Sequence, residues 1–183
     1  WFILLKILIG LNMPYPNFLT RFDAPSGTVF YFNQGSQEPE QLTCDVYIPG
    51  WALCGDIFLS YLSLEASSRS FLVVDSYDTS LFNGDLKLAL EHFGVGTAAF
   101  TFHGMSMGGY LVLDYLHQQQ QYHSETYLYG IRPSYPDAVI KKLKKMVQRD
   151  KNRALTWFYD QVFHKQISMD FFKDEYIESY LSF

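Results

Sequence analysis

The chain has 183 residues, of which 48% are hydrophobic and 18% aromatic, and it carries a net charge of −5. This composition is typical of a globular domain with a sizeable core and excludes a disordered chain. The negative charge excludes a whole-protein basic field for nucleic acid, and two cysteines are too few for a disulfide framework. No Cys and His spacing matches a zinc site, so we expect no metal and a reduced, cytoplasmic setting.

Residues 1–11 are almost wholly apolar. The run is shorter than the roughly 20 residues that a membrane-spanning helix needs. No basic stretch precedes it and no small-residue cleavage site follows it, as a signal peptide would require. We therefore expect no membrane span, and we expect the natural protein to start at Met13.

Residues 18–95 alternate between strand-like and helix-like patterns. Short aromatic and β-branched runs predict strands, and apolar residues at helical spacing predict helices. The expected elements are a hairpin of strands 18–22 and 28–32, a strand over 43–48, a helix over 57–66, a strand over 71–74 buried on both faces, and a helix over 86–93 that ends at Gly94.

Residues 98–121 contain the most informative motif. An apolar, strand-like run ends in Gly-Met-Ser-Met-Gly at 104–108, and an apolar helical segment follows directly. This G-x-S-x-G pattern between strand and helix predicts a nucleophile elbow, with Ser106 as the nucleophile. Side chains at Gly104 and Gly108 would collide with the strand and the helix, and Gly109 lets the first helical turn approach the sheet. The alternative is a glycine-rich turn in which the serine only caps the helix.

A serine nucleophile that attacks an acyl group needs hydrogen-bond donors for the oxyanion. One donor is the backbone N–H that follows the nucleophile, here that of Met107, and the other comes from the loop after an earlier strand. Pro49-Gly50-Trp51 follows the 43–48 strand, and Gly50 permits a turn that presents the N–H of Trp51. The alternative is a plain Pro-Gly turn beside a core tryptophan.

Residues 126–129 predict one further strand, and strands that alternate with helices indicate a parallel sheet. From residue 134 onward the pattern changes to short amphipathic helices rich in aromatic residues. The first is expected to start near Pro136, the second to be capped by Asp150 and the third by Ser168. These helices have the character of a lid over a sheet.

Residues 43–62, the elbow at 98–116 and the Arg132-Pro133 junction together resemble the α/β-hydrolase superfamily. The likeness is greatest to esterases of biotin synthesis that cleave pimeloyl-acyl carrier protein methyl ester. It implies an α/β fold whose mostly parallel sheet has helices on both faces, with a core over 13–133 and a helical cap over 134–183. In such enzymes the elbow serine attacks the acyl carbonyl, and no metal or organic cofactor takes part.

The resemblance also implies an acid and a base that follow two further strands beyond the cap. We therefore expect a sequence truncated within the cap, with those strands, the acid and the base beyond Phe183. In this fold the order along the chain is serine, acid, histidine. Within the chain the candidate base in that order is His164, with Asp137, Asp150 or Asp160 before it.

Three other polar residues near strand ends have structural interpretations. We expect His103, directly before Gly104, to pack beside the elbow. Asp75 and Asp78 follow the 71–74 strand, and we expect them to be loop and turn residues rather than the triad acid.

Residues 134–153 hold seven basic residues and two acidic ones, although the whole chain is acidic. The lysines lie opposite the apolar stripe of the same predicted helix, so an acidic macromolecule could dock there. In the resembled esterases the partner is acyl carrier protein. The candidate docking residues are Lys141, Lys142, Lys145 and Arg149, and the alternative is a solvated lysine face.

The sequence thus favours a hydrolase of carboxylic esters, either small or carrier-linked. One alternative is a thioesterase or acyltransferase that uses the same elbow. The other is a non-catalytic binding module, because no base for Ser106 is evident.

Overall fold

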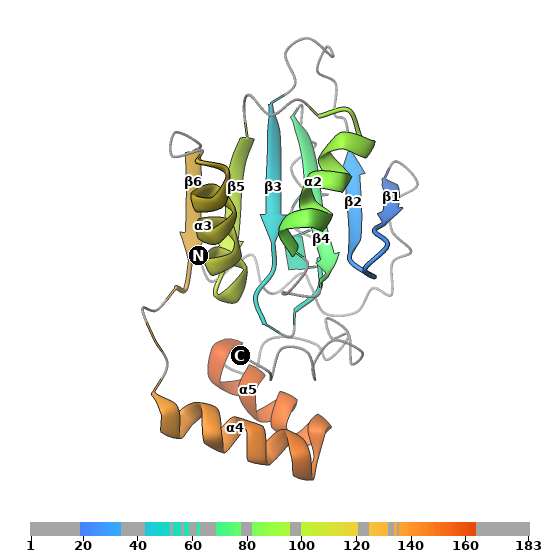
Figure 1. Cartoon of the computed structure of the whole chain (residues 1–183). Coiled ribbons are helices and arrows are strands. Elements are labelled where there is room, and N and C mark those ends of the chain that lie inside the picture. The colour runs from blue at the N-terminus through green and yellow to red at the C-terminus, as the bar shows by residue number, and fades with distance from the viewer. Residues whose placement is uncertain are drawn as a thin grey trace. The chain divides into compact units, whose positions relative to one another are not determined.

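The computed structural model of the chain describes residues 19–33, 43–51, 53–55, 57, 58, 62, 69–77, 82–95, 100–120, 125–131, 134 and 136–163. These residues divide into two compact units, one within 14–131 and the other within 132–171. The first contains a sheet and the second a pair of helices (Figure 1).

The sheet unit has six strands in the order β1-β2-β4-β3-β5-β6. The pairs β3–β4, β3–β5 and β5–β6 are parallel, whereas β1–β2 and β2–β4 are antiparallel. The sheet is therefore mixed and mostly parallel, as expected. Its parallel part runs from β4 through β3 and β5 to β6, and β1 and β2 are its antiparallel strands. The strands are β1 (Thr20–Asp23), β2 (Val29–Asn33), β3 (Cys44–Ile48), β4 (Ser70–Ser76), β5 (Phe100–Met105) and β6 (Glu125–Tyr129).

The predicted strands are confirmed. β1 and β2 form the expected hairpin, in which Phe22 pairs with Phe30. β4 lies between β2 and β3, and its residues Phe71 to Val74 are all buried. A continuous apolar run buried on both faces is what a strand inside such a sheet requires.

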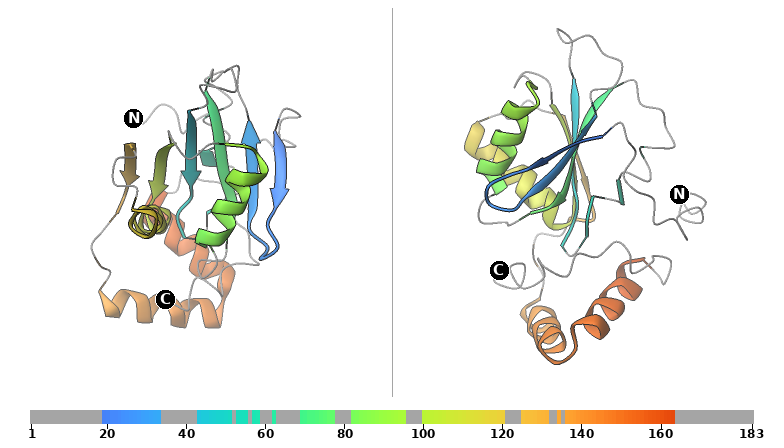
Figure 2. Two further views of the ribbon diagram at one scale, coloured as in Figure 1. Left: turned by 45° about the horizontal axis from the view of Figure 1, so that its top comes forward. Right: turned by 90° about the vertical axis from the view of Figure 1, so that its right-hand side faces the viewer.

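Two helices, α2 (Phe82–His92) and α3 (Met107–Gln119), cover one face of the sheet. Figure 2 shows both on the same side when the sheet is seen edge-on. Their apolar residues, among them Leu86, Leu90 and Val112, join a buried cluster with alternate residues of the strands. Gly94 follows α2 with a φ of +64°, so this helix ends where expected.

The opposite face of the sheet has its own apolar cluster. Phe58 and Leu62 pack there with Val29, Tyr31 and Val73. Residues 57, 58 and 62 are helical, in agreement with the helix predicted over 57–66, and the remaining residues of that helix lie outside the described part. Helical residues therefore cover both faces, as expected for this fold class.

The helical unit consists of α4 (Asp137–Arg149) and α5 (Lys151–Phe163). Pro136 occupies the N-cap position of α4, close to the predicted start. Val147, Ala154 and Leu155 are buried. The Asp150 carboxylate accepts the backbone N–H of Arg153 at 3.0 Å, so this residue caps α5 as predicted.

Some expectations concern residues that the structure does not describe. They include the start at Met13, the turn at Asp78, the Arg132-Pro133 junction, the helix capped by Ser168, and His164. Among the described helices, none combines the length and the hydrophobicity needed to cross a bilayer.

We predict that Asp150→Ala lowers the free energy of unfolding by about 1 kcal/mol, because the first turn of α5 loses its side-chain acceptor. Urea denaturation followed by circular dichroism measures the change. Asp150→Ser keeps a capping oxygen and should retain most of the stability. Equal losses in the alanine and serine variants would show that the cap does not stabilise α5.

Candidate functional site

Ser106 lies in the turn between β5 and α3, and its backbone is strained. Its φ is 49° and its ψ is −115°, a region that residues other than glycine rarely adopt. Such a conformation costs about 1–3 kcal/mol and persists only where the surrounding structure enforces it. Ser106 occupies the N-cap position of α3, yet its side chain makes no capping hydrogen bond. The capping alternative therefore does not explain the serine.

Two backbone hydrogen bonds hold this turn. The Ser106 N–H donates to the carbonyl of Tyr129 in β6 at 2.7 Å. The Ser106 carbonyl accepts the N–H of Gly109 at 3.0 Å. The turn is thus fixed on one side to the neighbouring strand and on the other to the first turn of α3.

The three glycines around Ser106 leave no room for side chains. A Cβ on Gly104 would lie 2.5 Å from the Gly109 Cα. A Cβ on Gly108 would lie 2.3 Å from the Ile48 carbonyl oxygen and 2.4 Å from that of Pro49. A Cβ on Gly109 would meet the side chain of Ile131 at 2.3 Å. The glycines therefore let α3 lie directly against β5 and against the end of β3.

The predicted oxyanion loop lies beside the elbow. A Cβ placed on Gly50 would be 3.2 Å from the Ser106 Cβ, so the loop after β3 approaches the serine closely. The side chains of Trp51 and Met107 both pack against the core on the face of the sheet that α2 and α3 cover. The N–H of Met107, at the start of α3, has no helical acceptor four residues before it. The fold thus brings the two predicted donor segments and Ser106 together at the carboxyl ends of β3 and β5.

Tyr77 anchors the loop after β3, a contact that the sequence did not reveal. Its side chain is fully buried, and its hydroxyl donates to the Pro49 carbonyl at 2.7 Å. Tyr77 directly follows β4, the strand next to β3. The only sequence signal for this contact was a tyrosine directly after an apolar run. The contact itself depends on the order of the strands in the sheet.

The prediction that Asp75 is a loop residue is wrong. Asp75 belongs to β4, which extends to Ser76, and its side chain is fully buried. The Gly55 N–H lies 3.2 Å from both the Asp75 carbonyl oxygen and the Asp75 Oδ1. This carboxylate therefore supports the loop that follows β3, and a Cβ on Gly55 would lie only 3.1 Å from the Asp75 Cα.

The described histidines lie at three different places. His92 stacks on Phe22 of β1 at 4.4 Å, at the opposite edge of the sheet from β6. His117 is in the last turn of α3, about 16 Å along the helix from Ser106 at a rise of ~1.5 Å per residue. His103 lies on β5, and its Nδ1 is 3.2 Å from the Tyr129 hydroxyl. His92 and His117 are thus too remote to activate Ser106.

His103 packs beside the elbow, as expected, but within an aromatic row. Its ring stacks on Tyr47 at 4.3 Å and on Tyr127 at 5.1 Å between centroids. Burial, assisted by the positive charge of Arg69 and opposed by Glu125, lowers the pKa of His103 from 6.5 to about 4. The imidazole is therefore neutral at pH 7.

The candidate docking residues all lie in the helical unit. Lys141, Lys145 and Arg149 are exposed and follow one another at helical spacing on one face of α4. The Lys142 ammonium instead lies 4.8 Å from the centre of the Trp157 ring in α5. Lys142 therefore contributes to packing between the two helices as well as to the charge of this face.

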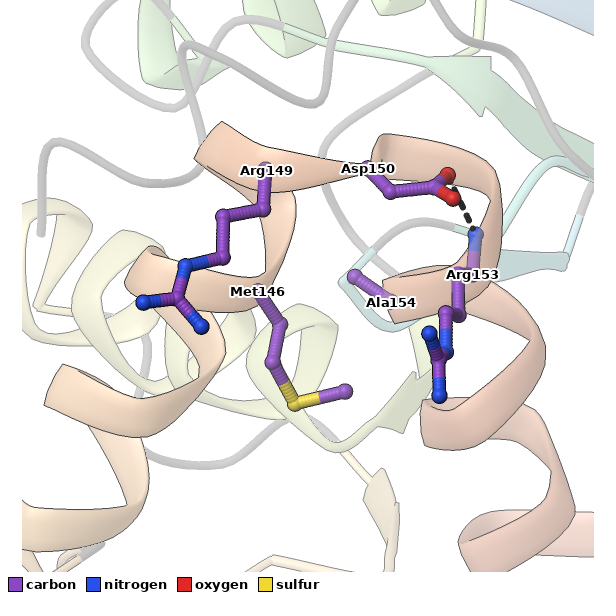
Figure 3. Close-up of a pocket in the computed structure, with 5 residues that line it drawn as sticks. All are labelled: Met146, Arg149, Asp150, Arg153 and Ala154. Carbon is purple, nitrogen blue, oxygen red and sulfur yellow. Dashed lines mark hydrogen bonds between the residues drawn. The ribbon is translucent and has the colours of Figure 1, made fainter.

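A hollow of about 270 Å³ lies where α4 meets α5 (Figure 3). Met146 and Ala154 supply its apolar lining, and Arg149 and Arg153 flank Met146 in this view. Asp150 also lines it but is engaged in capping α5. The basic face of α4 thus continues to a second arginine on α5.

No group of three or more His, Cys, Asp or Glu side chains in the described part of the chain could hold a metal ion. The two cysteines, Cys44 and Cys54, are both buried and form no disulfide.

Comparison with known proteins gives matches in structure only. No protein-family model and no curated protein matches the chain. Among solved structures, the chain is similar to the esterase RhEst1 from Rhodococcus sp. ECU1013, with a TM-score of 0.58 and 20% identity over 78% of this chain and 61% of that one. The esterase EaEST from Exiguobacterium antarcticum gives 0.60 and 21% over 89% and 67%. The chain has the α/β-hydrolase fold.

A bromoperoxidase from Bacillus anthracis is equally similar, with a TM-score of 0.62 and 21% identity over 84% of this chain and 65% of that one. The α/β-hydrolase fold is thus shared by proteins whose names denote different reactions. The chain spans between about three fifths and two thirds of the length of these three proteins. The reaction must therefore be argued from the site and not from the fold.

We predict that Gly108→Ala lowers the free energy of unfolding by about 1–3 kcal/mol, because its Cβ meets backbone atoms that cannot move aside. Gly84→Ala is the matched control, since nothing lies within 4 Å of a Cβ at that position in α2. This control should be about 1 kcal/mol more stable than the natural chain, because alanine favours a helix. Urea denaturation measures both, and a Gly108→Ala variant as stable as Gly84→Ala would contradict the close packing.

Proposed function

We propose that the chain carries the nucleophile of a serine hydrolase that cleaves carboxylic esters. The observation that supports this most strongly is the backbone of Ser106, held at a φ of 49° between Gly104 and Gly108 without a capping role. Strain of this kind is retained at sites where a side chain must be presented. The turn lies where parallel strands end and a helix begins, which is the setting of a nucleophile elbow.

In the proposed reaction the Ser106 Oγ attacks the acyl carbonyl carbon, and the carbonyl oxygen acquires negative charge. The N–H groups of Met107 and Trp51 stabilise this oxyanion, aided by the dipole at the N-terminus of α3. The carbon–oxygen bond to the alcohol then breaks, the alcohol leaves with a proton, and water hydrolyses the acyl-serine. Tyr77 serves this step indirectly, because it fixes the loop that carries Trp51.

The Ser106 proton requires a base. His92 and His117 lie far from it, and the His103 ring is stacked between Tyr47 and Tyr127. His164 fits the order of residues along the chain but lies outside the described part. Of the acids that precede His164, Asp150 is engaged in capping α5, which makes it a poor partner for a histidine. We propose that the acid and the base follow Ser106 in the chain.

We further propose that the natural ester is linked to an acidic acyl carrier protein, as in pimeloyl-acyl carrier protein methyl ester of biotin synthesis. The support is the basic face of α4, where Lys141, Lys145 and Arg149 lie in one line. Acidic and basic surfaces of this kind steer encounter and fix orientation. Two buried cysteines that form no disulfide fit the reducing cytoplasm in which such a partner would be met.

The test of the nucleophile is labelling with a fluorophosphonate probe and turnover of a p-nitrophenyl ester. Ser106→Ala should abolish labelling and reduce turnover by about 10³-fold or more, because the attacking oxygen is lost. Gly84→Ala should behave as the natural chain does. If the full natural coding product, with any residues that follow Phe183, remains unlabelled and inactive, the binding-module alternative is favoured, and thioester turnover above ester turnover would favour the thioesterase.

The test of the partner is charge reversal on α4. Replacing Lys141 and Lys145 by Glu should reduce kcat/KM for a carrier-linked ester by about tenfold, because two attractive charges become repulsive. The p-nitrophenyl ester should be turned over at the natural rate. Lys87→Glu on α2 of the sheet unit is the control for charge alone. Equal losses on both substrates, or an equal loss in the control, would contradict docking on α4.

A further inference from the structure

The strained turn at Ser106 is bonded to β6, which lies at one end of the strand order of the sheet. Within the described residues β6 has one sheet neighbour, β5, and the Tyr127, Leu128 and Tyr129 side chains are each more than a third exposed. The Tyr129 carbonyl nevertheless accepts the Ser106 N–H at 2.7 Å. Whatever fixes Tyr129 therefore also fixes the backbone of the serine.

His103 contacts the Tyr129 side chain directly. The two rings are nearly parallel, at an interplanar angle of 10° with centroids 6.3 Å apart. The Tyr129 hydroxyl lies 3.2 Å from the His103 Nδ1. With the imidazole proton on Nε2, Nδ1 accepts the hydrogen bond from the tyrosine.

His103 is itself held by the row of aromatic residues across three strands. Tyr47 of β3 and Tyr127 of β6 are its direct partners in the two parallel ladders. Their rings stack on the imidazole at interplanar angles of 13° and 12°. This sandwich fixes the plane of the ring, and therefore the direction in which Nδ1 points.

We propose that His103 and Tyr129 form a positioning pair for the nucleophile. His103 accepts the Tyr129 hydroxyl, Tyr129 is thereby held at the end of β6, and its carbonyl holds the N–H of Ser106. The pair touches no substrate, so both are positioning residues rather than catalytic ones. The consequence for ester cleavage rests on the proposed function, whereas the effect on the Ser106 backbone does not.

The protonation state of His103 supports this arrangement. A neutral ring is required for Nδ1 to accept, and burial together with Arg69 keeps the pKa of His103 near 4. The charged and titratable groups that face it are Arg69 before β4, Glu125, Tyr127 and Tyr129 of β6, and Tyr47 of β3. Of these, Glu125 alone opposes the neutral form, and it also accepts the Tyr127 hydroxyl at 2.5 Å.

Amide hydrogen exchange at Ser106, measured by NMR on the full chain, tests the pair directly. Tyr129→Phe removes only the hydroxyl, and His103→Phe keeps a flat ring in the stack while removing the acceptor. Each should speed exchange at the Ser106 amide by about tenfold, the effect of one lost hydrogen bond. The double variant should be no faster than either single one, because both remove the same interaction.

Tyr127→Phe is the matched control. It makes the same chemical change on the same strand, but its hydroxyl bonds Glu125 and not His103. Exchange at Ser106 should stay within about twofold of the natural rate in this control. A natural exchange rate in Tyr129→Phe, or a double variant whose effect equals the product of the two single effects, would overturn the proposal. If His103→Phe fails to fold, the proposal is tested by comparing the Ser106 amide exchange rate in Tyr129→Phe with that in Tyr127→Phe.

Ester turnover gives the second readout. Tyr129→Phe should lower kcat by about five- to tenfold and leave KM within about twofold, because the serine and not the acyl pocket is displaced. Tyr127→Phe should leave both constants unchanged. Inactivity of the full natural coding product, with any residues that follow Phe183, would refute the proposed function and leave the exchange result standing, so the two failures are distinguishable.

Discussion

The close approach of three backbone segments around Ser106 is the constraint on which the rest of the site depends. The end of β5, the start of α3 and the end of β3 meet there with no side chain between them. Gly108 lies against the Ile48 and Pro49 carbonyls, and Gly104 lies against Gly109. The segments are in contact, and the turn between β5 and α3 holds Ser106 in a strained conformation.

Interactions from elsewhere in the sheet hold this arrangement in place. Tyr77 after β4 holds the Pro49 carbonyl, and the buried Asp75 holds the Gly55 N–H. Tyr129 of β6 holds the Ser106 N–H. Each of these residues lies in or directly after a strand adjacent to the segment that it fixes. The order of the strands in the sheet therefore determines which contacts hold the turn at Ser106. The strained conformation of Ser106 costs about 1–3 kcal/mol and persists only because such contacts enforce it.

The local elements were predictable because short-range physics determines them. Periodicity located the hairpin, β4 and α2, and the G-x-S-x-G spacing located the elbow because glycine is required at each tight contact. The cap of α5 by Asp150 was also predictable, since a carboxylate before a helical run has one obvious acceptor role.

The supporting contacts were not predictable, because they depend on strand order. β4 lies between β2 and β3, and that placement brings Tyr77 to Pro49 and buries Asp75. The stack of His103 between Tyr47 and Tyr127 likewise depends on registers that no local pattern contains. The fold alone does not determine the reaction, since similar structures carry the names of esterases and of a bromoperoxidase. The residues of the site carry more information about the chemistry.

The most direct test of this account is the backbone conformation of Ser106 in solution. A positive φ brings a residue's N–H proton closer to its own Hα than an extended or helical conformation does. The intraresidue nuclear Overhauser effect between these protons should therefore be stronger for Ser106 than for Met105 and Met107 on either side. An effect at Ser106 no stronger than at these neighbours would contradict the account, because the serine would then not be held in the strained turn.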